Sequence, residues 1–297
     1  MKNFILIGAA GYIAPRHMKA IKESGNQIIA AYDPYDGVGI IDTYFPKAHF
    51  FTEFERFDRH IEKIKRLGTN IDYVSICSPN YLHDAHIRYG LRIGADVICE
   101  KPLVLNPWNV DRLIELENEY ANKVYTILQL RHHKSILKLR NKISKASSQK
   151  IFDIELNYIT SRGNWYFNSW KGNESKSGGI ATNIGVHFFD MLQWIFGSMI
   201  DYSVSIKSDH TNAGTLTFER ARVKWYLSIN SDNLPNEIKK QGLTTYRTLV
   251  IEGDKIEFSK GFTDLHTISY ETILKGKGYG LSDAKNAIDI VSKIRNA

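Results

Sequence analysis

The chain has 297 residues, of which 43% are hydrophobic and 24% are charged, a composition typical of a globular protein with one large or two ordinary domains. Its net charge of +7 is spread along the sequence, without the basic stripe and interleaved aromatic residues expected of a nucleic-acid-binding protein. The sequence contains no run of 18 apolar residues and Met1 leads directly into a strand pattern, which predicts neither a membrane partner nor a signal peptide.

The first half alternates short apolar runs with helical patterns. Apolar runs fall at residues 4–7, 27–32, 71–77, 96–99 and 124–128, and helical patterns at 14–24, 53–67, 80–93 and 107–121. Continuous apolar strands between helices are typical of a parallel sheet covered on both faces. We therefore predict an α/β class protein with an N-terminal doubly wound Rossmann domain over residues 1–128, whose ligands bind at the carboxyl ends of the strands.

The pattern changes near residue 151, where apolar and polar side chains begin to alternate. Alternation recurs near 152–158, 202–208, 215–229 and 246–258, and helical patterns fall at 179–196, 266–275 and 283–295. Alternation with a period of two indicates a sheet with one wet face. Residues 129–297 are thus predicted to form an α+β domain on a mostly antiparallel open sheet for substrate binding and oligomerisation, with the last helices as candidates to pack on the first domain.

Both cysteines, Cys77 and Cys99, lie in apolar strand-like runs without a metal-ligand partner at suitable spacing. This favours reduced core thiols in a cytoplasmic protein and predicts no metal, with a catalytic cysteine as the less favoured alternative. Basic residues recur in clusters such as Arg131 to Lys134. They fit either a solvated helix surface or attraction for an anionic small molecule.

A glycine-rich turn follows the first strand. Gly8 and Gly11 precede Tyr12 and Ile13 at the start of the first helix, where a backbone turn can hold a pyrophosphate at the helix N-terminus. Asp33 ends the second strand, 33 − 11 = 22 residues after Gly11, where a carboxylate accepts from ribose hydroxyls and disfavours a 2′-phosphate. The pattern predicts NAD rather than NADP, although a plain turn with a capping aspartate is the alternative.

Two further motifs end strands. The first, Ser78-Pro79-Asn80, is followed by His83, and by itself it is also a good helix start. The second, Glu100-Lys101-Pro102, places a lysine where packing gives no reason for one, although a surface turn explains it equally well. A lysine beside a cationic nicotinamide can have a lowered pKa and can polarise or deprotonate a substrate hydroxyl.

The helical pattern over residues 179–196 gathers Asn183, His187 and Asp190 on one face, because residues three and four apart are neighbours on a helix. Apolar residues at the remaining helical positions predict a buried stripe. An imidazole on such a half-buried helix is either a satisfied structural group or a catalytic one.

Taken together and in this order, the glycine turn, Asp33, the Ser-Pro-Asn motif with His83, the Glu-Lys-Pro motif and residues 179–190 resemble the glucose-fructose oxidoreductase and inositol dehydrogenase family over essentially the whole chain. The resemblance implies that Lys101 and His187 flank the carbon that gives up hydride. Many members carry aspartate four residues before the histidine, whereas this chain carries Asn183, which can orient a hydroxyl but cannot take its proton.

Six segments narrow this resemblance, at residues 11–17, 129–131, 162–166, 169–172, 183–190 and 261–266. They resemble one subgroup of the family, the UDP-N-acetylglucosaminuronate 3-dehydrogenases of bacterial surface-polysaccharide (O-antigen) synthesis. In this subgroup asparagine before the histidine is usual. The similarity implies NAD-dependent oxidation of the sugar C3 hydroxyl to a 3-keto sugar nucleotide, and a homotetramer. It also implies cofactor contacts from Ser78, Pro79, Asn80, His83, Glu100, Lys101, Gln129 and Trp170.

The substrate would carry a diphosphate and a uronate carboxylate. Candidates to bind these anions are Arg131, Arg162, Lys171 and Arg247, each of which can instead form a surface ion pair. Tyr166 belongs to an aromatic cluster that either packs as core or walls the nicotinamide and the sugar. His187 is favoured as general base with Lys101 as the orienting group, and the reverse assignment stays open.

Other functions remain compatible with the resemblance. An NAD-dependent glycosidase of this fold would oxidise C3 only transiently, and a dehydrogenase of another sugar or of inositol would use the same motifs. A regulator that binds NAD or a sugar nucleotide without turnover is disfavoured, because Lys101 and His187 are both present.

Overall fold

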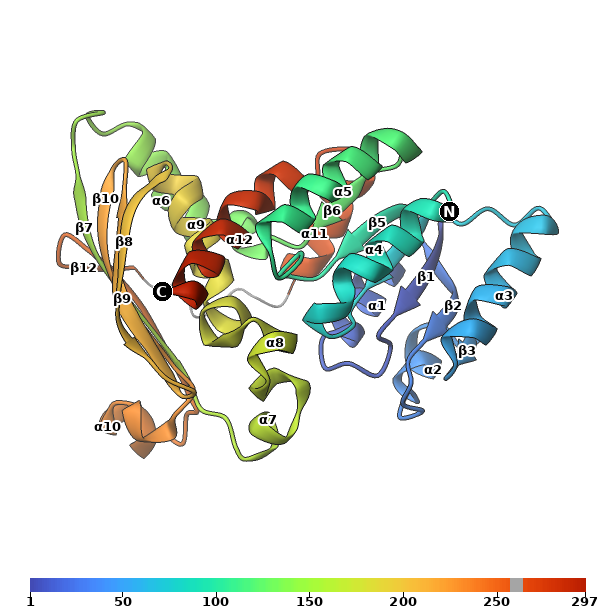
Figure 1. Cartoon of the computed structure of the whole chain (residues 1–297), viewed down its shortest axis with the longest axis horizontal. Helices are drawn as coiled ribbons and strands as arrows, with labels where there is room; N and C mark the ends of the chain where they lie inside the picture. Colours follow the sequence, from blue (N-terminus) through green and yellow to red (C-terminus); the bar gives the residue numbers. More distant parts are fainter. Residues whose placement is uncertain (257–263) are drawn as a thin grey trace. The chain divides into compact units, whose positions relative to one another are not determined.

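The computed structural model describes residues 1–256 and 264–297. The described residues divide into two compact units (Figure 1), the first comprising 1–104, 108–128 and 264–284 and the second comprising 105–107, 129–256 and 285–297. The end of the strand pattern at 246–258 and the first part of the motif at 261–266 lie outside the described residues. Within the described parts, no helix is long and apolar enough to cross a membrane.

The first unit is built on a parallel sheet with the strand order β3-β2-β1-β4-β5-β6 in its described residues. Its strands are β1 (Asn3–Ile7), β2 (Gln27–Tyr32), β3 (His49–Phe51), β4 (Tyr73–Ile76), β5 (Asp96–Cys99) and β6 (Val124–Thr126). The order reverses between β1 and β4, which is the switch point where doubly wound sheets bind ligands. The predicted Rossmann architecture is confirmed, and β3 is a strand that the sequence pattern did not indicate.

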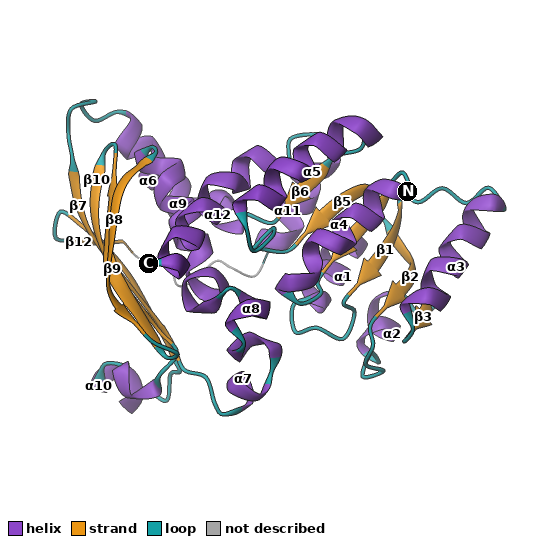
Figure 2. Ribbon diagram, in the orientation of Figure 1, coloured by secondary structure: helices purple, strands orange, loops and turns teal. Residues whose placement is uncertain are grey.

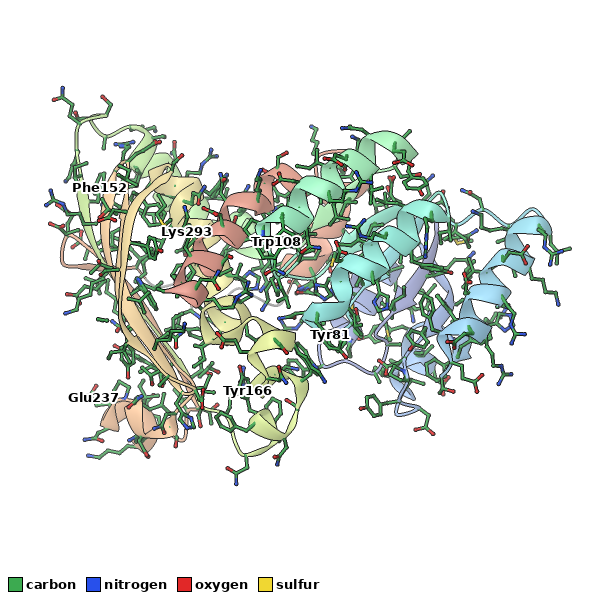
Figure 3. The ribbon with its side chains drawn as sticks, in the orientation of Figure 1. Tyr81, Trp108, Phe152, Tyr166, Glu237 and Lys293 are labelled. Atoms are coloured by element: carbon green, nitrogen blue, oxygen red, sulfur yellow. The ribbon has the colours of Figure 1, made fainter. Side chains whose placement is uncertain are left out.

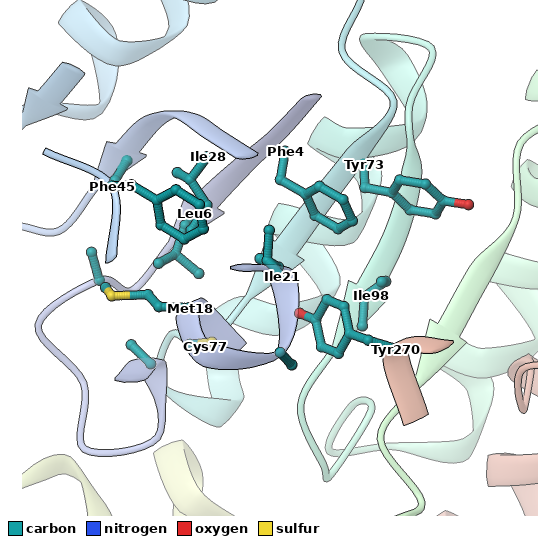
Figure 4. Close-up of a cluster of buried hydrophobic side chains, with 14 of the residues drawn as sticks. Phe4, Leu6, Met18, Ile21, Ile28, Phe45, Tyr73, Cys77, Ile98 and Tyr270 are labelled. Carbon is teal, nitrogen blue, oxygen red and sulfur yellow. The ribbon is translucent and has the colours of Figure 1, made fainter. Parts of the chain in front are cut away.

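Helices join these parallel strands. They are α1 (Ala14–Glu23), α2 (Ile40–Tyr44), α3 (Phe54–Arg66), α4 (His83–Arg92) and α5 (Pro107–Tyr120), with a short 3-10 helix, η1 (Asn80–Leu82), before α4. A late helix, α11 (Leu265–Leu274), also belongs to this unit and packs against α1. Figure 4 shows Tyr270 of α11 in the same buried cluster as Phe4 and Ile98. The core of the unit therefore combines segments that are far apart in the sequence.

A mixed sheet forms the second unit (Figure 2), with the order β12-β11-β7-β10-β9-β8. Its strands are β7 (Phe152–Thr160), β8 (Met199–Lys207), β9 (Thr211–Phe218), β10 (Ala221–Ser228), β11 (Thr245–Ile251) and β12 (Asp254–Ile256). The β7 and β10 strands pair in parallel, and the other neighbours are antiparallel. Burial alternates along β7 and β10, as the period of two predicted, because one face packs on helices.

The second unit also carries helices of its own. They are α6 (Lys134–Ser144), α7 (Trp165–Asn168), α8 (Glu174–Ser177), α9 (Val186–Phe196), α10 (Asn236–Lys240) and most of α12 (Leu281–Asn296). Short 3-10 helices lie at η2 (Gln129–His132), η3 (Trp170–Gly172) and η5 (Ser231–Asn233). The apolar stripe predicted on the 179–196 helix is buried, since Ile184, Phe188 and Leu192 are all less than a tenth exposed. This packing fixes the helix that carries His187.

Candidate active site

The glycine turn after β1 approaches the end of β4 closely. A side chain at Gly8 would place its Cβ 2.5 Å from the backbone carbon of Cys77, and the φ of Gly8 is +90°. Both conditions require glycine at this position. The amides of Gly8 and Ala9 donate to the Tyr32 carbonyl oxygen, at 2.8 and 3.2 Å. The turn therefore draws β1, β2 and β4 together at the switch point of the sheet and delivers the chain into α1.

Asp33 lies at the end of β2, where the sequence placed a ribose-binding carboxylate. One carboxylate oxygen accepts a hydrogen bond of 2.9 Å from the amide of Ala10, and the other accepts one of 3.0 Å from the amide of Tyr35. Asp33 thus caps the glycine turn, which is the alternative role considered for it. A carboxylate has about four lone-pair sites, so these two bonds leave it able to accept from a ribose as well.

The loops after β4 and β5 are joined by His83. Its ring nitrogens lie 2.7 Å from the Pro102 carbonyl oxygen and 2.8 Å from the Ser78 carbonyl oxygen, and the side chain is buried. The Ser78 hydroxyl lies 2.9 Å from Nδ1 of His86 on α4. The Ser-Pro-Asn loop therefore contacts the Glu-Lys-Pro loop through the imidazole of His83. Cofactor contacts from Ser78, Pro79, Asn80 and His83 stay predictions.

Glu100 directly precedes the candidate catalytic lysine and is only 6% exposed. Its Oε1 lies 2.9 Å from Nε2 of His17 and 2.9 Å from Nε2 of His266, and its Oε2 accepts a 3.1 Å hydrogen bond from the backbone amide of Lys101. The Lys101-Pro102 peptide bond is cis. Glu100 is thus bonded inside the first unit, which gives its carboxylate a supporting role beside Lys101.

The environment of Glu100 shifts two pKa values. Burial by itself raises the pKa of the Glu100 carboxyl, but the hydrogen bonds and charges of His17 and His266 outweigh burial and hold that pKa well below its usual range. Burial lowers the pKa of His17 despite its hydrogen bond to Glu100. The carboxylate is therefore ionised, with imidazole N–H groups donating to it.

In the second unit, the segment before α9 is a π-helical turn, Ala181–Gly185, that follows two glycines with positive φ, Gly178 and Gly179. Isolated π turns within helices are rare and are frequent at functional sites. Gly185 closes the turn, and a Cβ there would lie 2.6 Å from the side chain of Leu227 on β10. This close packing places Asn183 in the widened turn and His187 on the first turn of α9.

Asn183, His187 and Asp190 have different partners. The Asn183 amide donates a 2.9 Å hydrogen bond to the hydroxyl of Tyr166, which is itself 2% exposed and labelled on the segment around α7 in Figure 3. Nε2 of His187 lies 3.5 Å from the side-chain nitrogen of Gln129. These two contacts pair Asn183 with Tyr166 and His187 with Gln129 inside the second unit.

Arg131 and Asp190 form a buried bidentate ion pair. The guanidinium donates to the carboxylate at 3.1 Å from Nε and at 2.7 Å from Nη2, with the two side chains 6% and 3% exposed. Since this pair occupies much of the guanidinium, it assigns Arg131 a role in holding η2 against α9. Binding of a substrate anion by Arg131 stays a prediction.

The other predicted anion and cofactor ligands of this unit are more accessible. Nζ of Lys171 lies 4.2 Å from the ring centre of Trp170. The guanidinium carbon of Arg247 lies 5.1 Å from the ring centre of Tyr158 and 5.9 Å from the ring centre of Phe188, which follows His187 in the sequence. Arg162 is exposed at the end of β7. The segment 161–172 thus supplies basic and aromatic side chains beside Tyr166.

His17 and His266 end two of the segments that carry the resemblance, 11–17 and 261–266, and the sequence patterns assign them no role. Nε2 of each lies 2.9 Å from Glu100 in the core of the first unit, and Ser75 and Tyr270 contact Nδ1 of His17. A signal was present, because the strand-ending glutamate of the Glu-Lys-Pro motif leads out of a fully apolar run and needs buried donors. His17 and His266 lie 83 and 166 residues from Glu100 in the sequence, and this separation hid the partnership.

Comparison with known proteins supports this geometry. Residues 2–128 match the model of an oxidoreductase family with an NAD-binding Rossmann fold, and residues 142–234 match the C-terminal alpha/beta domain of the same oxidoreductase family. Among curated proteins, the putative oxidoreductase YteT of Bacillus subtilis is 25% identical over 66% of this chain and 47% of its own length. The D-glucoside 3-dehydrogenase of Escherichia coli is 27% identical over 48% of this chain and 40% of its own. The chain spans about half or less of these two relatives.

Solved structures match over the full length. The WlbA (WbpB) dehydrogenase of Thermus thermophilus, in complex with NAD and alpha-ketoglutarate, is 48% identical with a TM-score of 0.96, covering 99% of this chain and 95% of that one. The same enzyme in complex with NAD and UDP-GlcNAcA is 47% identical. The WlbA dehydrogenase of Bordetella pertussis, at 16% identity and a TM-score of 0.81 over 99% and 94% of the two chains, shows the fold alone. The chain therefore belongs to the Gfo/Idh/MocA oxidoreductase family, with NAD as its cofactor.

Proposed function

We propose that the chain oxidises the C3 hydroxyl of UDP-N-acetylglucosaminuronic acid and produces the 3-keto sugar nucleotide. The observation that carries this proposal is the 47% identity, over 99% of the chain, to a dehydrogenase solved with NAD and UDP-GlcNAcA. The contacts inside the second unit support it, because Asn183 donates to Tyr166 and the His187 ring lies beside Gln129. The product prepares C3 for amination in the synthesis of a bacterial surface polysaccharide.

The residues of the first unit fit NAD. The turn at Gly8 leaves no room for a side chain, Tyr12 is 88% exposed at the start of α1, and Asp33 places a carboxylate at the end of β2. When bound, NAD accepts the hydride that leaves C3. Gly11 and Ile13 would hold the pyrophosphate through the backbone, and Asp33 would accept from the ribose.

In the proposed chemistry the C3–H bond gives a hydride and the hydroxyl gives a proton, so that a carbonyl forms. His187 accepts the proton as the general base, with Gln129 next to its ring. Lys101 donates to the hydroxyl oxygen and stabilises negative charge on it. Asn183 orients a hydroxyl of the sugar, because its side-chain NH2 donates to Tyr166 and its carbonyl oxygen can accept from the sugar. Lys171 and Arg247 are proposed to bind the diphosphate and the uronate.

Single-turnover absorbance tests the proposal. The purified protein is mixed with NAD and UDP-N-acetylglucosaminuronic acid, and NADH formation is followed together with the mass of the sugar product. We expect NADH and a product two hydrogen atoms lighter than the substrate. Alpha-ketoglutarate, which is bound in the Thermus thermophilus enzyme, is added in a second arm to test whether it reoxidises the cofactor. No NADH with this sugar, but NADH with inositol or a free sugar, would overturn the substrate assignment.

The same assay distinguishes the proposed dehydrogenase from a glycosidase of this fold. A glycosidase returns the hydride and so releases free UDP or a cleaved sugar without net NADH. Oxidation of C3 with the nucleotide still attached supports the dehydrogenase. Cleavage without an oxidised product would replace it.

We further propose a cytoplasmic homotetramer. Support comes from the second sheet, whose edge strand β8 exposes Ile200, Tyr202 and Ile206 on the surface of the single chain. Light scattering after size exclusion tests the tetramer, and an Ile200→Lys/Ile206→Lys variant is expected to elute as a smaller species. A wild-type protein that scatters as a monomer at micromolar concentration would contradict this proposal.

A further inference from the structure

A cluster of buried polar side chains lies behind the Glu-Lys-Pro turn of the first unit. We call it the Glu100 cluster, and its members are His17, Ser75, Glu100, His266 and Tyr270. They come from α1, β4, the end of β5 and α11. All five are at most 6% exposed. The proposed hydride transfer uses none of these side chains, and burying so many polar groups is costly unless they are bonded together.

Hydrogen bonds connect the cluster from end to end. The Ser75 and Tyr270 hydroxyls lie 2.6 Å apart, and Nδ1 of His17 lies 2.7 Å from the Tyr270 oxygen. Nε2 of His17 then lies 2.9 Å from Glu100. His266 approaches the same carboxylate oxygen from α11 at 2.9 Å. The chain ends at Oε2 of Glu100, which accepts from the Lys101 amide.

The three groups His17, Glu100 and His266 also have the composition of a metal site, since one ligand atom of each lies within 4.8 Å of the others. The described residues bring no fourth histidine, cysteine, aspartate or glutamate into this group, whereas a closed zinc site has four ligands. Both nitrogens lie at 2.9 Å from one shared oxygen, the ordinary length of an N–H···O hydrogen bond. The geometry favours a carboxylate held by two imidazoles.

We propose that the Glu100 cluster is the positioning unit for Lys101, with His17 and His266 as positioning residues. The two imidazoles hold Oε1, so that Oε2 is directed at the amide of Lys101 and fixes the turn from which the lysine side chain starts. This inference rests on the proposed dehydrogenase function for the role of Lys101. It adds that α11, far along the sequence, supports the catalytic turn, because His266 and Tyr270 both belong to that helix.

Loss of one imidazole should displace the Glu-Lys-Pro turn without abolishing the binding of substrate or NAD. An ionised carboxylate that loses a donor in a buried place rotates or takes up a proton. The Lys101 amide then loses a fixed acceptor. Displacement of a catalytic group by about 1 Å costs on the order of 100-fold in rate, so kcat is expected to fall far more than KM or the affinity for NAD changes.

The test compares two substitutions at one position. His266→Leu removes the donor, and His266→Gln keeps an amide donor near the place of Nε2. We expect kcat to fall about 10- to 100-fold in the leucine variant, with KM changed less than about 3-fold, and to recover most of its value in the glutamine variant. Thr267→Val is the matched control on the same helix, since the Thr267 hydroxyl donates to the exposed Glu23, and its kcat should stay within about 2-fold.

A second readout needs no cofactor and no turnover. Hydrogen exchange of the peptide that contains Lys101 reports on its amide in the protein alone, and Pro102 adds no amide to the signal. Exchange should be faster in His266→Leu and near wild type in His266→Gln. If the leucine variant does not fold, Tyr270→Phe serves, because it removes only the hydroxyl that contacts His17. In that variant we expect a smaller fall in kcat, of about 3-fold.

The outcomes separate the two proposals. A wild-type protein that never reduces NAD with any sugar nucleotide refutes the function, while the exchange data still decide on the positioning of Lys101. Wild-type kcat and exchange in both His266→Leu and Tyr270→Phe would overturn the inference. Purification of the wild type with one metal ion per chain, lost together with His266, would overturn it as well and make the cluster a metal site.

Discussion

Glu100 in the first unit and Asp190 in the second are both buried carboxylates, at 6% and 2% exposure, and each lies close in sequence to a candidate catalytic residue. Glu100 precedes Lys101 and is held by two imidazoles. Asp190 follows His187 on α9 and is held by the guanidinium of Arg131. Both carboxylates would be costly to bury alone, yet their partners have different chemistry.

The guanidinium that holds Asp190 and the imidazoles that hold Glu100 differ in charge and in the number of donors that they offer. A guanidinium stays charged at any pH that a protein survives, and its planar fork fixes the geometry of the carboxylate. A neutral imidazole offers a single N–H donor. The second unit therefore supports His187 with a rigid ion pair, and the first supports Lys101 with a hydrogen-bond network from two imidazoles. Four experiments test this difference.

The largest effect is expected from the catalytic candidates themselves. Lys101→Met and His187→Asn should each lower the rate of hydride transfer by about 10²- to 10⁴-fold, because proton transfer and charge stabilisation each contribute in this range. Both variants should still bind NAD, since they leave the glycine turn and Asp33 intact. Stopped-flow NADH absorbance measures the rate, and NAD titration measures binding. Lys138→Met, an exposed position on α6, is the control.

The outcome also distinguishes the two side chains. A general base shows its own pKa in the pH dependence of the rate, and substitution removes that limb of the profile. If Lys101→Met loses the limb and His187→Asn keeps it, the assignment of base and orienting group is reversed. Near-normal turnover in both variants would refute the catalytic roles.

Breaking the ion pair of the second unit comes next in size. Asp190→Ala leaves the buried guanidinium of Arg131 uncompensated and should destabilise the unit by about 3 to 5 kcal/mol. The double variant Arg131→Met/Asp190→Leu removes both charges and should regain much of this loss. Denaturant unfolding followed by tryptophan fluorescence measures the difference, with Trp225 and Trp194 as reporters in this unit. Equal stability of the single and double variants would contradict the prediction that the loss in Asp190→Ala comes from the buried charge of Arg131.

The two units also differ in how far their sites follow from sequence. Gly8, Asp33 and Lys101 lie at the ends of apolar strands, and the parallel sheet brings such ends together by its topology. These positions could therefore be predicted. The segment around His187 is a regular apolar pattern, which located the helix and its buried face. The π turn at Asn183 depends on packing of Gly185 against Leu227, which no local pattern records.

The partners of buried charges were the hardest to predict. The pairing of Arg131 with Asp190 joins residues 59 apart, and that of Glu100 with His266 joins residues 166 apart. In sequence each looks like an ordinary polar residue near a helix end. Their identity follows only from the requirement that a buried carboxylate find donors, and that requirement does not say which donors the tertiary fold will supply.

Acid sensitivity of the first unit is the third test. Burial, followed by the charge of His83, lowers the pKa of His86 from 6.5 to about 4. A histidine whose folded pKa lies below its unfolded value contributes stability above pH 6.5 that is lost as the pH falls toward 4. The difference of 2.5 units corresponds to about 3 kcal/mol at 1.36 kcal/mol per unit.

His86→Gln should therefore lose less stability than the wild type between pH 7 and pH 4.5, with a difference in the same direction at every intermediate pH. Thermal unfolding monitored by fluorescence at a series of pH values measures it. His49→Gln, at an exposed position, is the control. Parallel curves for wild type and His86→Gln would contradict the lowered pKa. The guanidinium of Arg131 stays charged throughout this range.

The smallest effect is expected at Tyr166, where the second unit uses a neutral hydrogen bond instead of a charge. Tyr166→Phe removes the acceptor of the Asn183 amide, which is worth about 0.5 to 1.5 kcal/mol. KM for the sugar nucleotide should rise a few-fold with kcat little changed, because Asn183 keeps its place in the π turn but loses its fixed rotation. Asn183→Ala should raise KM further and leave NAD affinity unchanged. If instead Tyr166→Phe lowers kcat as strongly as His266→Leu, one neutral hydrogen bond in the second unit positions the substrate as firmly as the Glu100 cluster positions Lys101.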